Sequence, residues 1–251
     1  MKTRSASLWA AVALLCCVTG AWAQSGDAPP AQSNGIAPAL MAKAQAGNAA
    51  AEFQVGFAFA NGKGVPRDFK EAARWYRKSA EQGNADAQSL LGVLYRNGHG
   101  VPQDYAEAAL WSRRAALQGN AFAQLTLGLD YYQGKGVPQD FTQAALWYRR
   151  AAMQGNAGAK EELGLLYEDG KGVPQDFSEA YFWTSLAAAS MDSSLDDGQD
   201  LHQSMEDRDR IAAHLTQAEL LKVQERTREW FAAHQPKTQK ESRQSGDAGP
   251  N

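Results

Sequence analysis

The four histidines are the first side chains to consider for metal or acid–base chemistry. None has a Cys or His partner three or four residues away, the spacing that lets a helix hold a zinc ion on one face. They are His99, His202, His214 and His234. Solvated surface histidines are the simpler interpretation, and no metal site is predicted from them.

An acidic run suggests calcium. It consists of Asp192, Asp196, Asp197 and Asp200. The run lacks the alternating oxygen ligands before a glycine that define an EF-hand loop. A solvated loop is therefore favoured over a calcium site.

Residues 128–135 imitate a phosphate-binding loop, with Gly, five residues and then Gly-Lys. A P-loop needs four intervening residues, a Ser or Thr after the Lys, and a preceding strand. Here Gly136 follows the Lys, and the preceding segment has a helical pattern. With no nucleophile–base constellation either, the sequence predicts a protein that is not an enzyme and has no cofactor.

The elements that would position any site come from an internal repeat. The motif Gly-Val-Pro-Gln/Arg-Asp begins at Gly64, Gly100, Gly136 and Gly172, always 36 residues apart. It divides the chain into units 48–83, 84–119, 120–155 and 156–191. Such self-similarity is typical of repeat architectures.

Each unit reads as two helices joined by the glycine- and proline-containing turn. An Asn preceded by Gly opens each first helix, at Asn48, Asn84, Asn120 and Asn156. An Asp followed three residues later by Glu or Gln opens each second helix, at Asp68, Asp104, Asp140 and Asp176. The latter pattern predicts a capping box with Asp in the Ser/Thr role.

Two columns of residues are predicted to be structural. The second helices repeat Trp75, Trp111, Trp147 and Trp183. The first helices repeat Gly56, Gly92, Gly128 and Gly164, each followed three residues later by Phe or Tyr. Because Gly costs about 1 kcal/mol against Ala inside a helix, its recurrence predicts close helix packing with aromatic rings alongside. An aromatic ladder for sugar is the less favoured use of the Trp column.

A candidate binding surface follows from the positions that these columns leave free. Positions 3, 6, 10 and 13 of each unit share one side of the first helix. The predicted binding residues are Phe53, Phe57, Asp86, Arg96, Phe122, Leu125, Leu129, Tyr132, Glu161 and Glu168. They predict an apolar groove with Arg96 inside and an acidic end. The alternative, that these apolar residues pack between repeats, stays open.

The first 23 residues read as a secretory signal peptide, with Lys2 and Arg4 before an apolar run over 8–18. Ala21 and Ala23 predict cleavage before Gln24. A membrane anchor is disfavoured because eleven apolar residues are too few for ~30 Å of hydrocarbon, and a lipid-modified Cys16 because Leu15 precedes it. Both cysteines lie here, so the exported chain would lack thiols. Residues 24–38 and 235–251 are predicted to be flexible.

The net negative charge of the chain argues against nucleic acid and anionic lipid as partners. The 25 Lys and Arg residues fall to 23 once Lys2 and Arg4 are removed, against 28 Asp and Glu residues. An acidic chain without a basic run has no electrostatic footprint for nucleic acid or anionic lipid.

The pattern AxxxxLGxxYxxGxGVPxDxxxAxxWYRxAAxQG over residues 48–191 resembles the Sel-one-like repeat (SLR), a subfamily of tetratricopeptide-like repeats. The resemblance implies an all-α fold, a right-handed α/α solenoid of 36-residue hairpins. Residues 39–47 resemble a half-repeat, and 192–234 an irregular hairpin ending in a capping helix.

The resemblance also implies a function. It implies an exported, periplasmic or secreted adaptor that binds a protein or peptide on the concave face of the solenoid, in envelope signalling, assembly or host interaction. The alternative is a peptidoglycan- or polysaccharide-binding envelope module.

Overall fold

The computed structural model describes residues 35–190 and 199–234, and these residues are helical with no strand. The helices are α2 (Pro38–Gln45), α3 (Ala49–Asn61), α4 (Phe69–Glu81), α5 (Ala85–Asn97), α6 (Tyr105–Leu117), α7 (Ala121–Gln133), α8 (Phe141–Met153), α9 (Ala157–Asp169), α10 (Phe177–Ala188), α11 (Gln199–Ala212) and α12 (Gln217–His234). The predicted signal peptide, most of the linker, the C-terminal tail and Asp192, Asp196 and Asp197 fall outside the described residues.

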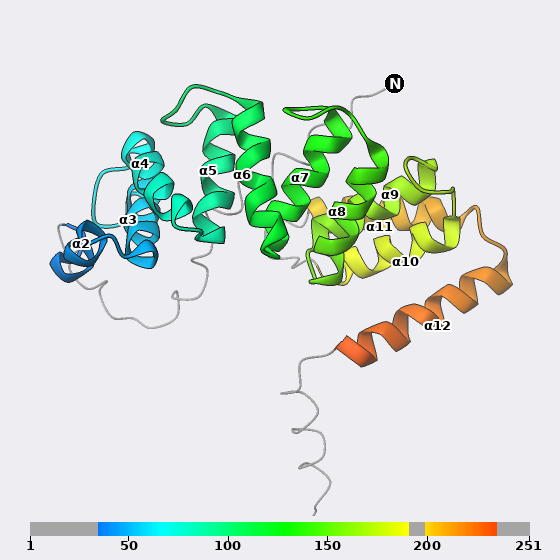
Figure 1. Ribbon diagram of the computed structural model, residues 1–251. Coiled ribbons are helices and arrows are strands. Elements are labelled where there is room, and N and C mark those ends of the chain that lie inside the picture. The colour runs from blue at the N-terminus through cyan, green and yellow to red at the C-terminus, as the bar shows by residue number, and fades with distance from the viewer. Residues whose placement is uncertain (1–34, 191–198, 235–251) are drawn as a thin grey trace, which may run out of the picture.

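Four hairpins repeat along the chain: α3/α4, α5/α6, α7/α8 and α9/α10. From α2 to α10, each helix packs mainly against the helices before and after it in the sequence, so the hairpins stack in a row (Figure 1). This arrangement is that of an α/α solenoid, and the predicted all-α solenoid is confirmed. At the N-terminal end, α2 packs on α3, and its Ala44 joins Trp75 in one buried cluster.

The repeated turn stops one helix and starts the next. Asn120 Oδ1 accepts a hydrogen bond from Ala123 N at 2.9 Å, and the equivalent asparagines do the same. Asp104 Oδ1 accepts from Ala106 N and Glu107 N. Gly98, which ends α5, has a left-handed φ of 68°.

Only half of each predicted capping box forms at the second helices. The backbone N–H of Asp104 donates to Tyr95 O at 2.9 Å, and the other three capping aspartates make the equivalent bond. The Glu or Gln side chain three residues later is therefore not needed for that N–H. At α12, by contrast, both arms of the box between Thr216 and Glu219 are present.

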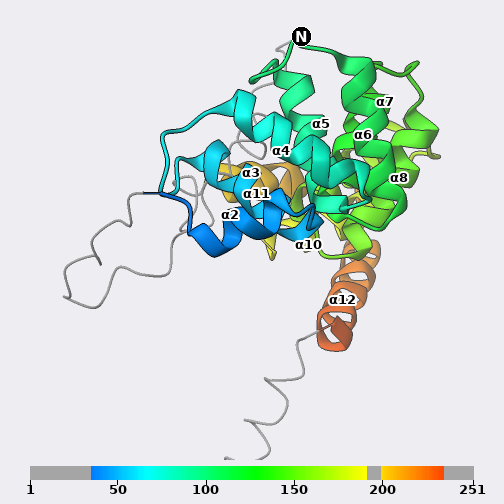
Figure 2. The ribbon, with the colours of Figure 1, turned by 60° about the vertical axis from the view of Figure 1, so that its left-hand side comes forward.

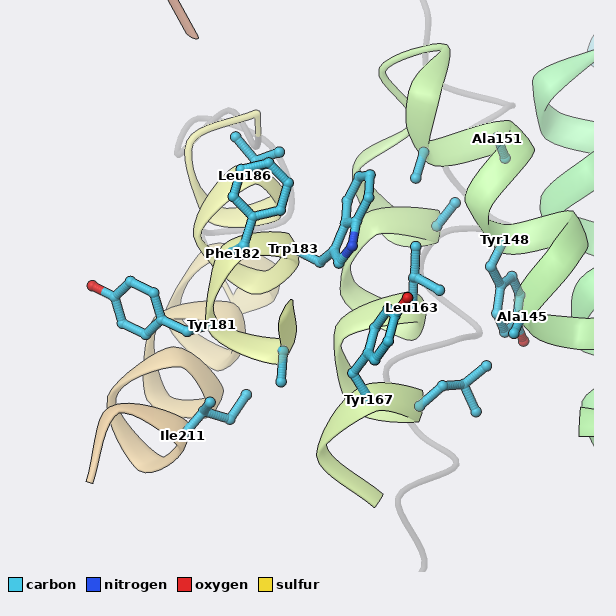
Figure 3. Packing of buried hydrophobic residues seen from close by; sticks show 14 of the residues in the cluster. Ala145, Tyr148, Ala151, Leu163, Tyr167, Tyr181, Phe182, Trp183, Leu186 and Ile211 are labelled. Carbon is cyan, nitrogen blue, oxygen red and sulfur yellow. The ribbon is translucent and has the colours of Figure 1, made fainter. Parts of the chain in front are cut away.

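The Trp column lies in the core, with exposed fractions of 4–6%. Trp183 extends from α10 toward α9, where Leu163 and Tyr167 lie (Figure 3). The glycine column allows the two helices of a hairpin to approach closely. A Cβ on Gly128 would stand 2.6 Å from Tyr148, a ring of α8 that is itself fully buried. The ring beside Gly128 thus comes from the second helix, as does that of Tyr76 beside Gly56. At Gly92 and Gly164 the nearest side chains are Ser112 and Thr184, so the predicted aromatic ring stands beside only two of the four glycines.

The C-terminal helices do not form a fifth hairpin like the others. Both α11 and α12 pack on α10, and they contribute Ile211 and Val223 to the core. One side of α12 faces this core: Val223 and Thr227 are buried, and Trp230 is half-buried. In both views the far part of α12 extends past the stacked hairpins (Figure 1 and Figure 2).

Candidate binding surface

The ten predicted binding residues lie on α3, α5, α7 and α9, and we refer to them as the first-helix stripe. Six are half-buried: Phe53, Phe57, Phe122, Tyr132, Glu161 and Glu168. Three are buried: Arg96, Leu125 and Leu129. Asp86 is exposed. Most of the stripe is therefore a surface that neighbouring helices partly cover.

The first hairpin contributes an aromatic pair to the stripe. The ring centroids of Phe53 and Phe57 are 6.3 Å apart, and Phe53 also lies 5.9 Å from Tyr76. The Lys63 ammonium, in the turn after α3, lies 5.0 Å from the centroid of Phe57. A cation over an aromatic ring places an apolar surface beside a positive charge. Aromatic side chains of this kind are common anchor points for a protein partner.

The third hairpin repeats this chemistry. Tyr132 packs edge-on against Phe141 at 5.3 Å, and Lys171 from the next turn lies 5.9 Å from the Tyr132 ring. Phe122 lies half-buried on the same helix. Two half-buried aromatic groups, each with a lysine, thus occupy the first and third hairpins.

Arg96 forms a buried ion pair with Asp130 and also approaches Thr126 O at 3.5 Å. Burial raises the pKa of Asp130 to about 7, and the Arg96 guanidinium acts against that rise. The contact joins α5 to α7 across the boundary between two hairpins. Arg96 therefore holds repeats together and offers little surface to a partner.

Leu125 also packs between repeats, and Leu129 is buried on the same helix. Leu125 Cδ2 lies 3.5 Å from the position that a Cβ of Gly158 would occupy, so this leucine covers the start of α9. Because both leucines are buried, the packing alternative describes them better than an open groove does.

Glu168, at the acidic end of the stripe, pairs with an arginine of α11, a helix outside the repeat. Glu168 accepts two hydrogen bonds from Arg210 of α11, at 2.8 and 2.6 Å. Arg210 also pairs with Asp207. Burial, and secondarily the nearby Asp207 carboxylate, raise the pKa of Glu162 to about 7. The pairing of Arg210 with Glu168 could not be predicted from the repeat pattern, because α11 lies outside the repeat.

The four histidines considered for metal chemistry all lie within the described residues. Within residues 35–190 and 201–234, no group of three or more His, Cys, Asp or Glu side chains is arranged so that it could hold a metal ion. Three histidines stack on aromatic rings, His99 on Phe69, His214 on Phe177 and His234 on Trp230. Within the same ranges no helix is both long enough and apolar enough to cross a membrane.

Stacked hairpins of this kind define an α-solenoid, a class of scaffold in which each unit contacts only its neighbours. The Sel1 repeat model matches residues 49–84, 85–120, 121–156 and 157–190, more than half of the chain. The protein belongs to the Sel1 repeat family. Sel1 repeats typically act as protein-interaction modules.

Two similar solved structures show the same fold. One is a protective antigen present in uropathogenic Escherichia coli strains, with 33% identity and a TM-score of 0.60, covering 68% of this chain and 40% of that protein. The other is a Sel1 repeat protein from Oxalobacter formigenes, with 36% identity and a TM-score of 0.58, covering 62% of this chain and 64% of that one. The chain thus spans less than two thirds of either protein. Among curated proteins no match was found.

Proposed function

We propose that this chain is an exported, non-enzymatic adaptor that holds a protein or peptide partner on the concave face formed by its first helices. Its role would be in envelope signalling, assembly or host interaction. The similar Escherichia coli protein is a protective antigen, which is in keeping with export. The signal-like residues 1–23 support the same compartment.

The main support for the binding face is the state of its aromatic side chains. The repeated tryptophans are buried in the core. On the first helices, four aromatic side chains are only half-buried: Phe53, Phe57, Phe122 and Tyr132. Aromatic residues in a partly desolvated setting are the usual anchors of protein partners. Lys63 adds positive charge beside them, whereas Lys171 is already paired with Asp169 at 2.9 Å, so an apolar segment with an acidic residue near Lys63 is the partner that fits best.

The polysaccharide alternative gains less support. Sugar-binding ladders need exposed ring faces, and the four tryptophans of the repeat column are in the core. Within the described residues, no observation favours a sugar over a peptide.

The experiment is capture of envelope proteins with the mature chain as bait, comparing two double variants. Phe122→Ala with Tyr132→Ala removes both rings of the third hairpin from the stripe. Leu110→Ala with Leu146→Ala is the matched control, because these leucines are 42% exposed on second helices. The proposal expects the first variant to lose a partner that the control retains.

Circular dichroism and thermal melting must stay near those of the wild-type chain for both variants. If the Phe122/Tyr132 variant still captures the partner, or the control loses it equally, the stripe is not the binding face. If the Phe122/Tyr132 variant unfolds, these rings are part of the core and the assignment fails as well.

A further inference from the structure

A pocket of about 580 Å³ lies on the other side of the hairpins, between α8 and α10. Its lining includes Arg149 and Met153 of α8, Tyr167 of α9 and Trp183 of α10. Pro174, Gln175 and Asp176 of the repeated turn lie along it, and Glu179 of α10 and Arg226 of α12 complete the lining. None of these residues belongs to the first-helix stripe.

The pocket is a special case of a junction that recurs along the stack. Arg77 donates to the Tyr95 hydroxyl, Arg113 to that of Tyr131 and Arg149 to that of Tyr167. Each junction therefore places an arginine of one hairpin over a tyrosine of the next. Only the last of these junctions is bordered by α12, because α12 packs on α10.

Helix α12 is attached at this junction by Arg226. Its guanidinium pairs with Glu179 and lies 3.9 Å from the centroid of Phe182. Nearby, Gln224 Nε2 donates to the Tyr181 hydroxyl at 3.3 Å. These contacts attach α12 to α10 beside the pocket.

Of the charged side chains that line the pocket, some have an oppositely charged partner and others do not. Glu179 accepts from Arg226 and from Trp183 Nε1, the latter at 3.2 Å. Asp176 caps α10 by accepting from Glu179 N at 2.9 Å. Arg149 has no carboxylate partner within the described residues; its contacts are the Tyr167 hydroxyl and the face of that ring, 5.8 Å away. One guanidinium is thus left to attract an anion.

We propose that this pocket binds the C-terminal carboxylate of a peptide whose last side chain is apolar. Arg149 presents a planar fork of donors that matches a carboxylate. Met153, which is 57% exposed, and Pro174 offer apolar surface for the side chain. The volume falls in the range of about 300–1,000 Å³ that is usual for sites of small ligands.

A single negative charge fits this pocket better than a phosphate group. Asp176 and Glu179 also line the pocket, and their carboxylates repel a dianion about twice as strongly as a single negative charge. Because Met153 is 57% exposed, the pocket is open to solvent beside this side chain, which leaves room for the residues that precede a peptide's end.

The test is calorimetric titration of the mature full-length chain with N-acetyl-Gly-Gly-Phe and with its C-terminal amide. The free acid is expected to bind at least about tenfold more tightly than the amide, because a charge-assisted bond is lost. Arg149→Gln should weaken binding of the acid by a similar factor. Arg113→Gln, the same change at the equivalent junction without α12, should leave it unchanged. Arg226→Gln should weaken it by removing the wall.

Four results would overturn the proposal. They are equal binding of acid and amide, equal losses in Arg149→Gln and Arg113→Gln, no heat of binding with either peptide, and binding of 3-phenylpropionate as tight as that of the peptide. The last would show that a free organic acid is the ligand. Circular dichroism of each variant checks the fold, and Arg149 is exposed, so its replacement is not expected to disturb it.

Discussion

Arg96 of α5 and Asp130 of α7 form an ion pair that is buried between the second and third hairpins. We expect Arg96→Met to lower the free energy of unfolding by about 3–5 kcal/mol, because it leaves a buried carboxylate without its cation. Arg96→Met combined with Asp130→Leu should recover most of that loss, since the desolvation cost of both charges disappears. Urea denaturation of the two single variants and the double variant measures the coupling.

Arg114→Met is the control for this pair, because Arg114 is exposed and stacks on Trp111 of its own helix. It should change stability by no more than about 0.5 kcal/mol. A double variant as unstable as the sum of its singles would show that the two side chains act independently.

The position of a tryptophan in the stack should decide its importance. Trp111→Ala is expected to cost about 3–5 kcal/mol, because it opens a cavity in a buried interior cluster. Trp230→Ala, on the half-buried part of α12, should cost less, since it has one neighbouring unit instead of two. Equal or reversed losses in urea melts would contradict the assignment of interior and end.

The glycine column provides a test of helix contact against helix propensity. Gly128→Ala should destabilise the protein although Ala is the better helix former by about 1 kcal/mol, because the new Cβ would meet the buried ring of Tyr148 at 2.6 Å. Gly158→Ala is the matched control, with its nearest contact at an ordinary 3.5 Å, and should stabilise. Thermal melts of both variants should shift in opposite directions.

Glu162 should make stability depend on pH. Its pKa is raised from 4.5 to about 7 in the folded protein, so the folded state binds the proton more tightly than the unfolded chain. Its contribution is fully present below about pH 4.5 and is lost as the pH rises through about 7. Glu162→Gln mimics the protonated form, and we expect it to melt at a higher temperature than the wild-type chain at about pH 8.

The difference between Glu162→Gln and wild type should shrink toward about pH 5. Exposed Glu81→Gln serves as the control and should follow the wild-type profile. A Glu162→Gln variant that parallels wild type at every pH would show that this carboxyl is not titrating in that window.

Export makes a prediction about the N-terminus. Signal peptidase cleavage after Ala23 should give a mature chain that begins at Gln24. Mass spectrometry of the protein from the periplasm or medium would show that start. A chain that keeps Met1 and stays in the cytoplasm would contradict both the cleavage and the export.

The sequence by itself determined the hairpins, their period and their caps. These features depend on local chemistry: Asn120 bonds to a backbone N–H three residues on, and Gly98 takes a left-handed φ that other residues rarely adopt. A regular spacing of Trp111 and its equivalents also identified the core, because equivalent positions in stacked units have equivalent neighbours.

Only the tertiary structure decided which stripe residues stay accessible and how the stack ends. Arg96 pairs with Asp130, which is 34 residues further along the chain. Arg226 pairs with Glu179 across 47 residues, so neither ion pair could be predicted from local spacing. Arg210 and Arg226 lie on helices outside the repeat, where periodicity gives no information about packing. Their positions depend on how α11 and α12 both pack against α10. That packing arises from contacts between residues far apart in the sequence, so it appears only in the folded chain.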